Sequence, residues 1–243
     1  MEDSVYKSWF FGEIMRWKSY VIIFLVVVSG VFYYNISGNV ILERERVFVS
    51  RVIDGDTVEL GSGLKARLKG INTPEKGMLY YQDAKEFLVG LIENKSVYIE
   101  SFGGDKYGRI LVYVFLNKRN LNKEILQNGF GHLYYYDKDQ YFDDLERAEE
   151  FARLNGRGIW KKSSDVDCVN LVELKEDEPE KLVLENVCSK DVEVLIKDEA
   201  THIYHETLEA DSVFVKETSH IWNTGGDSLW VWDEKGLLVF YRY

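Results

Sequence analysis

The chain has 243 residues, 46% hydrophobic and 14% aromatic, which is enough apolar material for one large domain or two of ordinary size. The net charge of -11 is uneven, because Lys+Arg and Asp+Glu number 18 and 17 in residues 47–162 but 7 and 19 in residues 163–243. The acidic tail, residues 163–243, is therefore excluded as a phosphate-binding surface, whereas the central segment is not.

The first predicted element is a membrane anchor at residues 19–36. Residues 20–34 carry no charge, and the wider stretch 17–36 approaches the ~20 residues that a spanning helix needs. Lys7, Arg16 and Lys18 precede it, which favours a cytoplasmic N-terminal segment at residues 1–18 and an extracytoplasmic remainder. The sequence thus predicts a single-pass membrane protein. A cleaved signal peptide and a buried core helix are the alternatives.

Residues 47–162 alternate in the manner of short strands with a few helices. The predicted strands are Val47–Ile53, Thr57–Leu60, Leu64–Ile71, Val97–Phe102 and Ile110–Leu116. The predicted helices are Tyr80–Glu93, Leu121–Asn128 and Phe142–Leu154. Five strands with a helix after the third fit a closed barrel of the oligonucleotide-binding (OB) type, in an α+β, mostly β class.

Residues 169–243 are dominated by β-runs separated by turn residues at short intervals. The predicted strands are Leu182–Glu185, Asp191–Ile196, Ile203–Leu208, Ser212–Lys216, Ser228–Trp232 and Leu237–Tyr241. This spacing predicts an immunoglobulin-like β-sandwich. Cys168 and Cys188 are the two cysteines of the chain. They are either a disulfide pair, if the chain faces an oxidising compartment, or two unrelated buried thiols.

Three clusters in the central segment carry groups suited to phosphodiester chemistry. They are Ile53-Asp54-Gly55-Asp56-Thr57, Arg67-Leu68-Lys69-Gly70-Ile71-Asn72-Thr73-Pro74-Glu75 and Asp105-Lys106-Tyr107-Gly108-Arg109. Hydrolysis of a phosphodiester needs a cation near the phosphoryl oxygens, an oriented water and donors for the developing charge. The order and spacing of the clusters resemble the staphylococcal nuclease (thermonuclease) family. The stretch Ile221–Leu237 is similar to the end of the lamin-tail domain.

The family resemblance implies a role for each of nine residues. The implied catalytic residues are Arg67, Glu75 and Arg109, with Glu75 acting on the attacking water and the arginines holding the phosphate. The implied substrate-binding residues are Lys106, Tyr107 and Tyr135. The implied metal ligands are Asp56, Asn72 and the backbone carbonyl of Thr73, whose oxygens suit Ca2+. The family commonly has aspartate at position 72, and the asparagine here is expected to weaken cation binding.

Several of these residues also have ordinary structural explanations. Asp54 is interpreted as a turn carboxylate rather than a ligand. Arg67 lies in an apolar strand, where a structural ion pair is the rival role. Glu75 could be a helix-start carboxylate, and Tyr135 could belong to the core.

The resulting hypothesis is a membrane-anchored, cation-dependent nuclease. It would act on single- or double-stranded DNA and RNA with little sequence preference and, as the resemblance implies, leave 3′-phosphates. The alternative is a catalytically silent nucleic-acid-binding or surface interaction protein with a nuclease-like barrel.

Overall fold

The computed structural model describes residue 26 and residues 44–135, 137–200 and 202–243. The predicted membrane anchor at residues 19–36 and the segment before it lie outside this part of the chain, residue 26 excepted. Within the described part, no helix combines the length and the apolar character needed to cross a bilayer. Residues 44–243 cluster into a single unit.

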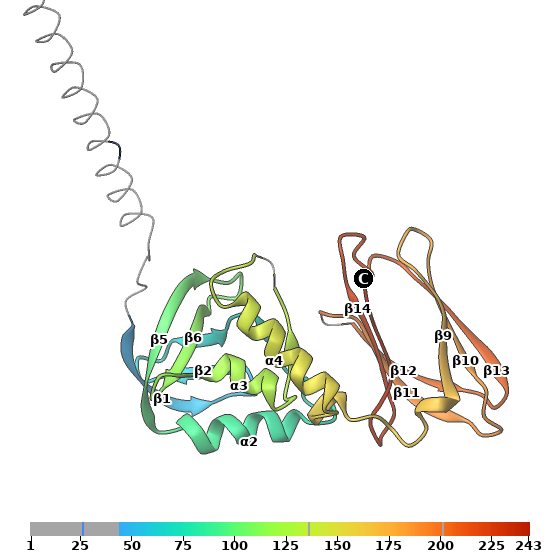
Figure 1. Ribbon diagram of the computed structural model, residues 1–243, viewed down its shortest axis with the longest axis horizontal. Helices are drawn as coiled ribbons and strands as arrows, with labels where there is room; N and C mark the ends of the chain where they lie inside the picture. The colour runs from blue at the N-terminus through green and yellow to red at the C-terminus, as the bar shows by residue number, and fades with distance from the viewer. Residues whose placement is uncertain (1–25, 27–43, 136, 201) are drawn as a thin grey trace, which may run out of the picture. The chain divides into compact units, whose positions relative to one another are not determined.

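The central segment folds into a barrel of five strands (Figure 1). The strands are β1 (Glu45–Val52), β2 (Thr57–Leu60), β3 (Lys65–Leu68), β5 (Lys95–Gly104) and β6 (Ile110–Leu116). Neighbours pair antiparallel in the order β3-β2-β1-β5-β6, and a parallel pairing of β3 with β6 closes the sheet. The buried side chain of Asn122 holds this seam, because it donates to the carbonyls of Lys69 and Val112 and accepts from the amide of Val114.

Three helices and three two-residue strands complete this region. They are α2 (Tyr81–Ile92), α3 (Leu121–Gln127), α4 (Phe142–Leu154), β4 (Ile71–Asn72), β7 (Arg119–Asn120) and β8 (His132–Leu133). Helix α2 buries Ala84, Leu88 and Ile92, which recur every four residues and so form one apolar stripe. The predicted helices are confirmed to within about one residue at each end, as expected for periodic segments. The five strands and three helices fit the OB-like fold of the prediction.

The tail forms two antiparallel sheets. One contains β13 (Ser212–Thr218), β10 (Glu180–Asn186) and β9 (Val169–Lys175); the other contains β12 (Ile203–Leu208), β11 (Val192–Lys197), β14 (Ser228–Trp232) and β15 (Leu237–Arg242). Inward residues of both sheets share one apolar core, including Leu182, Leu184, Ile196, Leu229 and Val231. The arrangement is consistent with the predicted β-sandwich, whereas the immunoglobulin-like connectivity stays a prediction.

The barrel and the tail share a second apolar cluster. Ile159 and Trp160, in the 3-10 helix η1 (Gly158–Trp160), pack with Trp230, Trp232 and Leu237. The Trp160 and Trp230 rings lie 4.6 Å apart, and the indole N–H of Trp232 donates to the carbonyl of Ile159. The backbone of Leu237 also bonds to both Lys161 and Ser163. These contacts join the end of the barrel region to β14 and β15.

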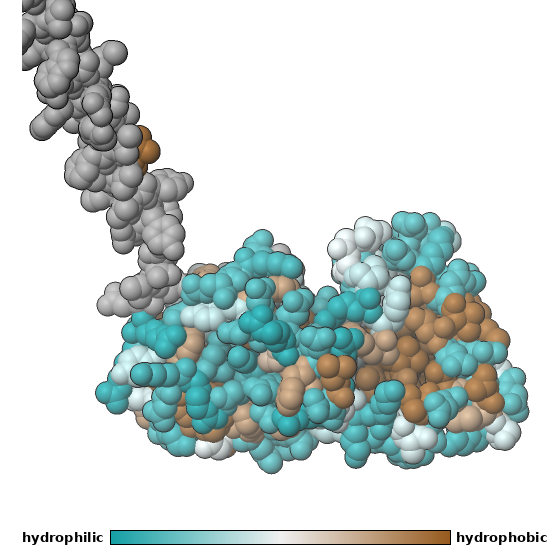
Figure 2. Space-filling view, in the orientation of Figure 1, coloured by the Kyte–Doolittle hydropathy of each residue, from teal (hydrophilic) through white to brown (hydrophobic). Residues whose placement is uncertain are grey.

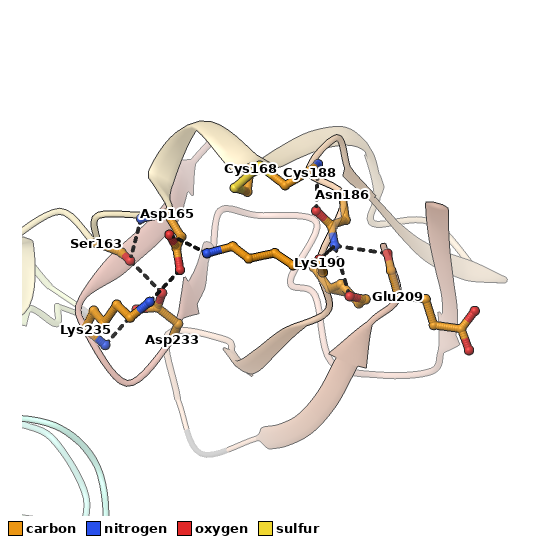
Figure 3. Close-up of a disulfide and its surroundings, with 10 residues drawn as sticks. Ser163, Asp165, Cys168, Asn186, Cys188, Lys190, Glu209, Asp233 and Lys235 are labelled. Atoms are coloured by element: carbon orange, nitrogen blue, oxygen red, sulfur yellow. Dashed lines mark hydrogen bonds and ion pairs between the residues drawn. A yellow bond between two sulfur atoms is a disulfide. The ribbon is translucent and has the colours of Figure 1, made fainter. Parts of the chain in front are cut away.

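Cys168 and Cys188 form a disulfide, so the first of the two predicted alternatives is confirmed (Figure 3). Cys168 ends the 3-10 helix η2 (Val166–Cys168), and Cys188 follows β10. Nearby, Asp165 accepts ion pairs from both Lys190 and Lys235. The start of the tail is therefore tied covalently and electrostatically to two of its turns.

The outer face of the three-stranded sheet is apolar. Val172 on β9 and Val213 and Val215 on β13 are all more than half exposed. Figure 2 shows hydrophobic surface over these strands.

Candidate active site

The structure brings all nine predicted site residues to one cleft of about 750 Å3. The lining includes Asp56, Arg67, Asn72, Thr73, Glu75, Lys106, Tyr107, Arg109 and Tyr135. They come from the β1–β2 turn, β3, β4, the loop after β4, the β5–β6 turn and the segment after β8. The convergence that the enzyme hypothesis requires is present, while the role of each residue stays a prediction.

Asp56 fixes the turn between β1 and β2 against the loop after β4. It is 6% exposed, and its Oδ2 accepts from the backbone N–H and the hydroxyl of Thr73 at 3.0 and 2.9 Å. Close approach explains the glycine before it, since a Cβ at Gly55 would lie 2.7–2.9 Å from atoms of Ala84 and Thr73. Asp54 accepts the backbone N–H of Asp56, which matches its interpretation as a turn carboxylate.

Arg67 lies between the two side chains predicted to bind the cation. Its Nη1 is 3.2 Å from Oδ1 of Asp56, and its Nη2 donates to Oδ1 of Asn72 at 3.0 Å. Only 11% of the side chain is exposed. The structural ion pair weighed from the sequence therefore exists, and Arg67 uses the same oxygens that a cation would use.

Arg109 is aimed into the cleft by the turn between β5 and β6. The carboxylate of Asp105 accepts the backbone N–H groups of Tyr107 and Arg109 and pairs with Nε of Arg109 at 2.7 Å. Burial tends to raise the pKa of Asp105, but these bonds from Arg109 and Tyr107 outweigh it and lower that pKa. Nη1 of Arg109 also donates to the Thr57 hydroxyl at 3.4 Å.

Glu75 differs from the other predicted catalytic residues because its side chain is exposed. The preceding residues Thr73 and Pro74 are buried, and the ring of Pro74 fixes the backbone direction at this corner. Within the described residues, no hydrogen bond reaches the Glu75 carboxylate. It can therefore accept a proton or orient a water without first giving up a partner.

The three predicted substrate-binding residues differ in how firmly they are held. Tyr107 is 71% exposed, and Nζ of Lys106 lies 5.2 Å from its ring centre. Tyr135 is half-buried: it packs edge-on against Phe142, and its hydroxyl bonds to that of Tyr113. Tyr135 thus lines the cleft and also contacts the core, so both of its predicted interpretations have support.

The oxygen donors in the cleft fit a hard cation in kind. Asp56 supplies carboxylate oxygens, Asn72 an amide oxygen and Thr73 a backbone carbonyl, the neutral and anionic mixture that Ca2+ accepts. Asp54 stands beside them, and burial, followed by repulsion from Asp56, raises its pKa to about 6. Within the described residues, no group of three or more His, Cys, Asp or Glu side chains is placed to hold a metal ion.

Comparison with known proteins identifies the family. A family model described as staphylococcal nuclease homologue matches residues 65–162. An uncharacterized endonuclease of Haemophilus influenzae is 30% identical over 131 residues, covering 51% of this chain and 71% of that protein. An uncharacterized endonuclease of Escherichia coli is 35% identical over 127 residues, covering 50% and 78%. A probable staphylococcal-like nuclease of Oryza sativa is 34% identical over 106 residues, covering 43% and 28%.

This chain belongs to the staphylococcal nuclease homologue family. The chain is therefore an enzyme of the nuclease class, a hydrolase. The family match ends at residue 162, so the lamin-tail resemblance of residues 221–237 stays a prediction.

Two residues that line this nuclease cleft were not predicted as site residues. Lys69 and Phe102 line it, with Nζ of Lys69 4.6 Å from the Tyr135 ring centre and ion-paired to Asp139. A lysine that directly follows a strand, in a segment that already carries Arg67, could have indicated that Lys69 lines the cleft. Ala200, in the tail, also lines the cleft. Its neighbours in the sequence give no sign of this placement.

Proposed function

We propose that this nuclease hydrolyses phosphodiester bonds of DNA and RNA with little sequence preference, depends on a divalent cation, and leaves 3′-phosphates. Ca2+ is the proposed cation. The observation that supports this function best is the convergence in one cleft of two arginines, hard oxygen donors and a glutamate whose carboxylate accepts no hydrogen bond from the described residues. Little sequence preference is proposed because Tyr107 and Tyr135 line the cleft, and stacking of bases on tyrosine is tolerant of sequence.

Each residue of the cleft has a chemical task in this proposal. Asp56, Asn72 and the Thr73 carbonyl would hold the cation, which neutralises phosphoryl oxygens when bound. Glu75 accepts the proton of the attacking water. Arg109 donates to a phosphoryl oxygen and stabilises the charge that develops in the transition state. Arg67 would supply a second guanidinium to the phosphate, in competition with its contacts to Asp56 and Asn72.

We also propose that residues 19–36 anchor the enzyme in a membrane with the nuclease outside the cytoplasm. The Cys168–Cys188 disulfide supports this location, because such bonds persist in oxidising compartments. The two-sheet tail supports an immunoglobulin-like, lamin-tail-like domain of unassigned partner. Protease digestion of intact cells should remove the tail, and a tail protected until lysis would contradict the location.

The function is tested by digestion of single- and double-stranded DNA and of RNA with the full chain. The expected result is cleavage with Ca2+ that stops on addition of chelator. The products should carry a phosphate at the 3′ end and a free hydroxyl at the 5′ end, so that a kinase can label the 5′ end without prior dephosphorylation. Binding of nucleic acid without chelator-sensitive cleavage would instead support the silent binding protein. The full chain is required because the barrel and tail share buried aromatic residues.

A further inference from the structure

Strand β4 lines the cleft with Ile71 and Asn72, and it pairs with β8 in a short ladder. Ile71 pairs with Leu133, and Asn72 pairs with His132. A ladder of two residues per strand has little stability of its own, so its position depends on what packs against it. The ladder is linked to the tail by three contacts: a hydrogen bond, an aromatic contact and an ion pair.

The first contact is made by Asn72 itself. Its Oδ1 accepts from Arg67, and its Nδ2 donates to the backbone carbonyl of Glu199 in the tail at 3.4 Å. The next tail residue, Ala200, lines the cleft. An aspartate at position 72 would keep the bond from Arg67 but would direct an anionic oxygen at the Glu199 carbonyl. The amide at this position thus matches its neighbour in the tail.

The second contact is aromatic. The buried ring of His132, the partner of Asn72 in the ladder, lies 5.1 Å from the ring of Trp230 on β14. Trp230 is fully buried and stacks on Trp232 at 5.0 Å. Because both rings are buried and in contact, a displacement of Trp230 acts directly on His132.

The third contact is an ion pair. Glu149 on α4 accepts the backbone N–H of Leu133 at 2.7 Å. The same carboxylate receives both ends of the Arg242 guanidinium from β15, at 2.6 and 3.1 Å. The side chain of Glu149 is 6% exposed and that of Arg242 is 32% exposed, so the carboxylate is shielded from solvent, and the two bonds make the pair geometrically specific.

We propose that Glu199, Trp230 and Arg242 of the tail are positioning residues for the nuclease site. They fix the β4–β8 ladder and thereby set where the oxygens of Asn72 and Thr73 lie. The catalytic consequence rests on the proposed function, whereas the mechanical coupling does not. The tail is in this respect part of the active site rather than an independent module.

The coupling is tested by hydrogen–deuterium exchange on the full chain. Arg242→Gln should raise exchange of the β4 and β8 amides about tenfold or more, because Leu133 then bonds to a carboxylate that has lost its anchor. The matched control is Arg147→Gln on the exposed face of α4, where the arginine pairs with Asp144 and, among the described residues, with no other carboxylate. It should leave both strands unchanged. Faster exchange confined to β15 in Arg242→Gln would overturn the proposal.

A second measurement tests the consequence for the site. In Arg242→Gln the Ca2+ concentration needed for half-maximal cleavage should rise about tenfold, since misplaced ligands weaken binding. A tail that only supports folding would change the amount of active enzyme and not this concentration, and that result would restrict the tail to a structural role. Arg242→Lys should recover part of the effect, because lysine retains the charge but not the two-bond geometry.

The two arms separate the possible failures. If the wild-type chain cleaves no nucleic acid while exchange in β4 and β8 rises in Arg242→Gln, the proposed function fails and the coupling stands. If Arg242→Gln does not fold, the exchange comparison is made with Arg242→Lys, which keeps a cation beside Glu149. Unchanged β4 and β8 exchange in that variant would overturn the coupling.

Discussion

Replacement of Asp56 by asparagine should separate the two tasks of this carboxylate. Its oxygens receive Thr73 twice, the Thr57 hydroxyl and the Arg67 guanidinium. The NH2 group of an asparagine must point either toward the Thr73 donors or toward the Arg67 guanidinium. In each orientation one hydrogen-bond donor then faces another donor. Loss of about two charge-assisted bonds, at about 1.5–3 kcal/mol each, predicts that the free energy of unfolding in chelator falls by about 3–6 kcal/mol.

The same variant should lose its response to calcium. If the cation binds at Asp56, Ca2+ at 100 times its Kd stabilises the wild type by about 2.7 kcal/mol. Urea unfolding followed by tryptophan fluorescence, with chelator and then with Ca2+, measures both effects. The control is Asp143→Asn on the exposed side of α4, which should retain the calcium response. Equal stabilisation of Asp56→Asn and wild type by Ca2+ would refute binding at this carboxylate.

Three further predictions follow from individual side chains. Glu75→Gln should reduce turnover about 10²–10⁴-fold, yet shift unfolding by no more than about 0.5 kcal/mol because the residue is exposed; unaltered cleavage would remove Glu75 from the mechanism. The Asp54 pKa of about 6 lies above its ordinary value of 3.8, so the folded state favours the protonated form and ionisation lowers stability as pH rises from about 4 to 6. In chelator, Asp54→Asn should therefore exceed the wild type in stability by about 1–2 kcal/mol above pH 6, allowing for partial solvent exposure, and lose that advantage near pH 4; a pH-independent difference would contradict this. Reduction of the Cys168–Cys188 disulfide, which closes a separation of 20 residues, should lower the free energy of unfolding by about 3 kcal/mol, and equal urea midpoints with and without reductant would argue against it.

Much of the site could be predicted from the sequence because its residues occur in compact clusters. Asp54 to Thr57 and Asn72 to Glu75 are each set by a local turn, and such turns have recognisable residue types. Elements β2, β6 and α4 were predicted with the bounds that the structure has, whereas the predicted strand Leu64–Ile71 is divided into β3 and β4. The sequence could not show that Arg67 bonds to both Asp56 and Asn72, because that depends on rotamers within the closed barrel.

The role of the tail was harder to predict. Strand β9 was missed because its alternation is interrupted at Val172, where the register against β10 shifts, and because a run of acidic residues follows the strand. The large apolar side chains of Trp230 and Trp232 indicate burial. The sequence cannot show that Trp160 of the barrel region is one of the residues against which they pack. The prediction of separate domains at residues 47–162 and 169–243 therefore did not include the apolar cluster to which both segments contribute.

The bonds of Arg67 to Asp56 and Asn72 have a consequence for the order in which ligands arrive. A cation held by Asp56 and Asn72 would compete with the guanidinium for these oxygens, so that Arg67 would become available to a phosphate. Binding of the cation should then raise the affinity for the nucleic acid, and binding of the nucleic acid should raise the affinity for the cation by the same factor. Calcium titrations with and without a short oligonucleotide would measure that factor, and a value of one would mean that the two load independently.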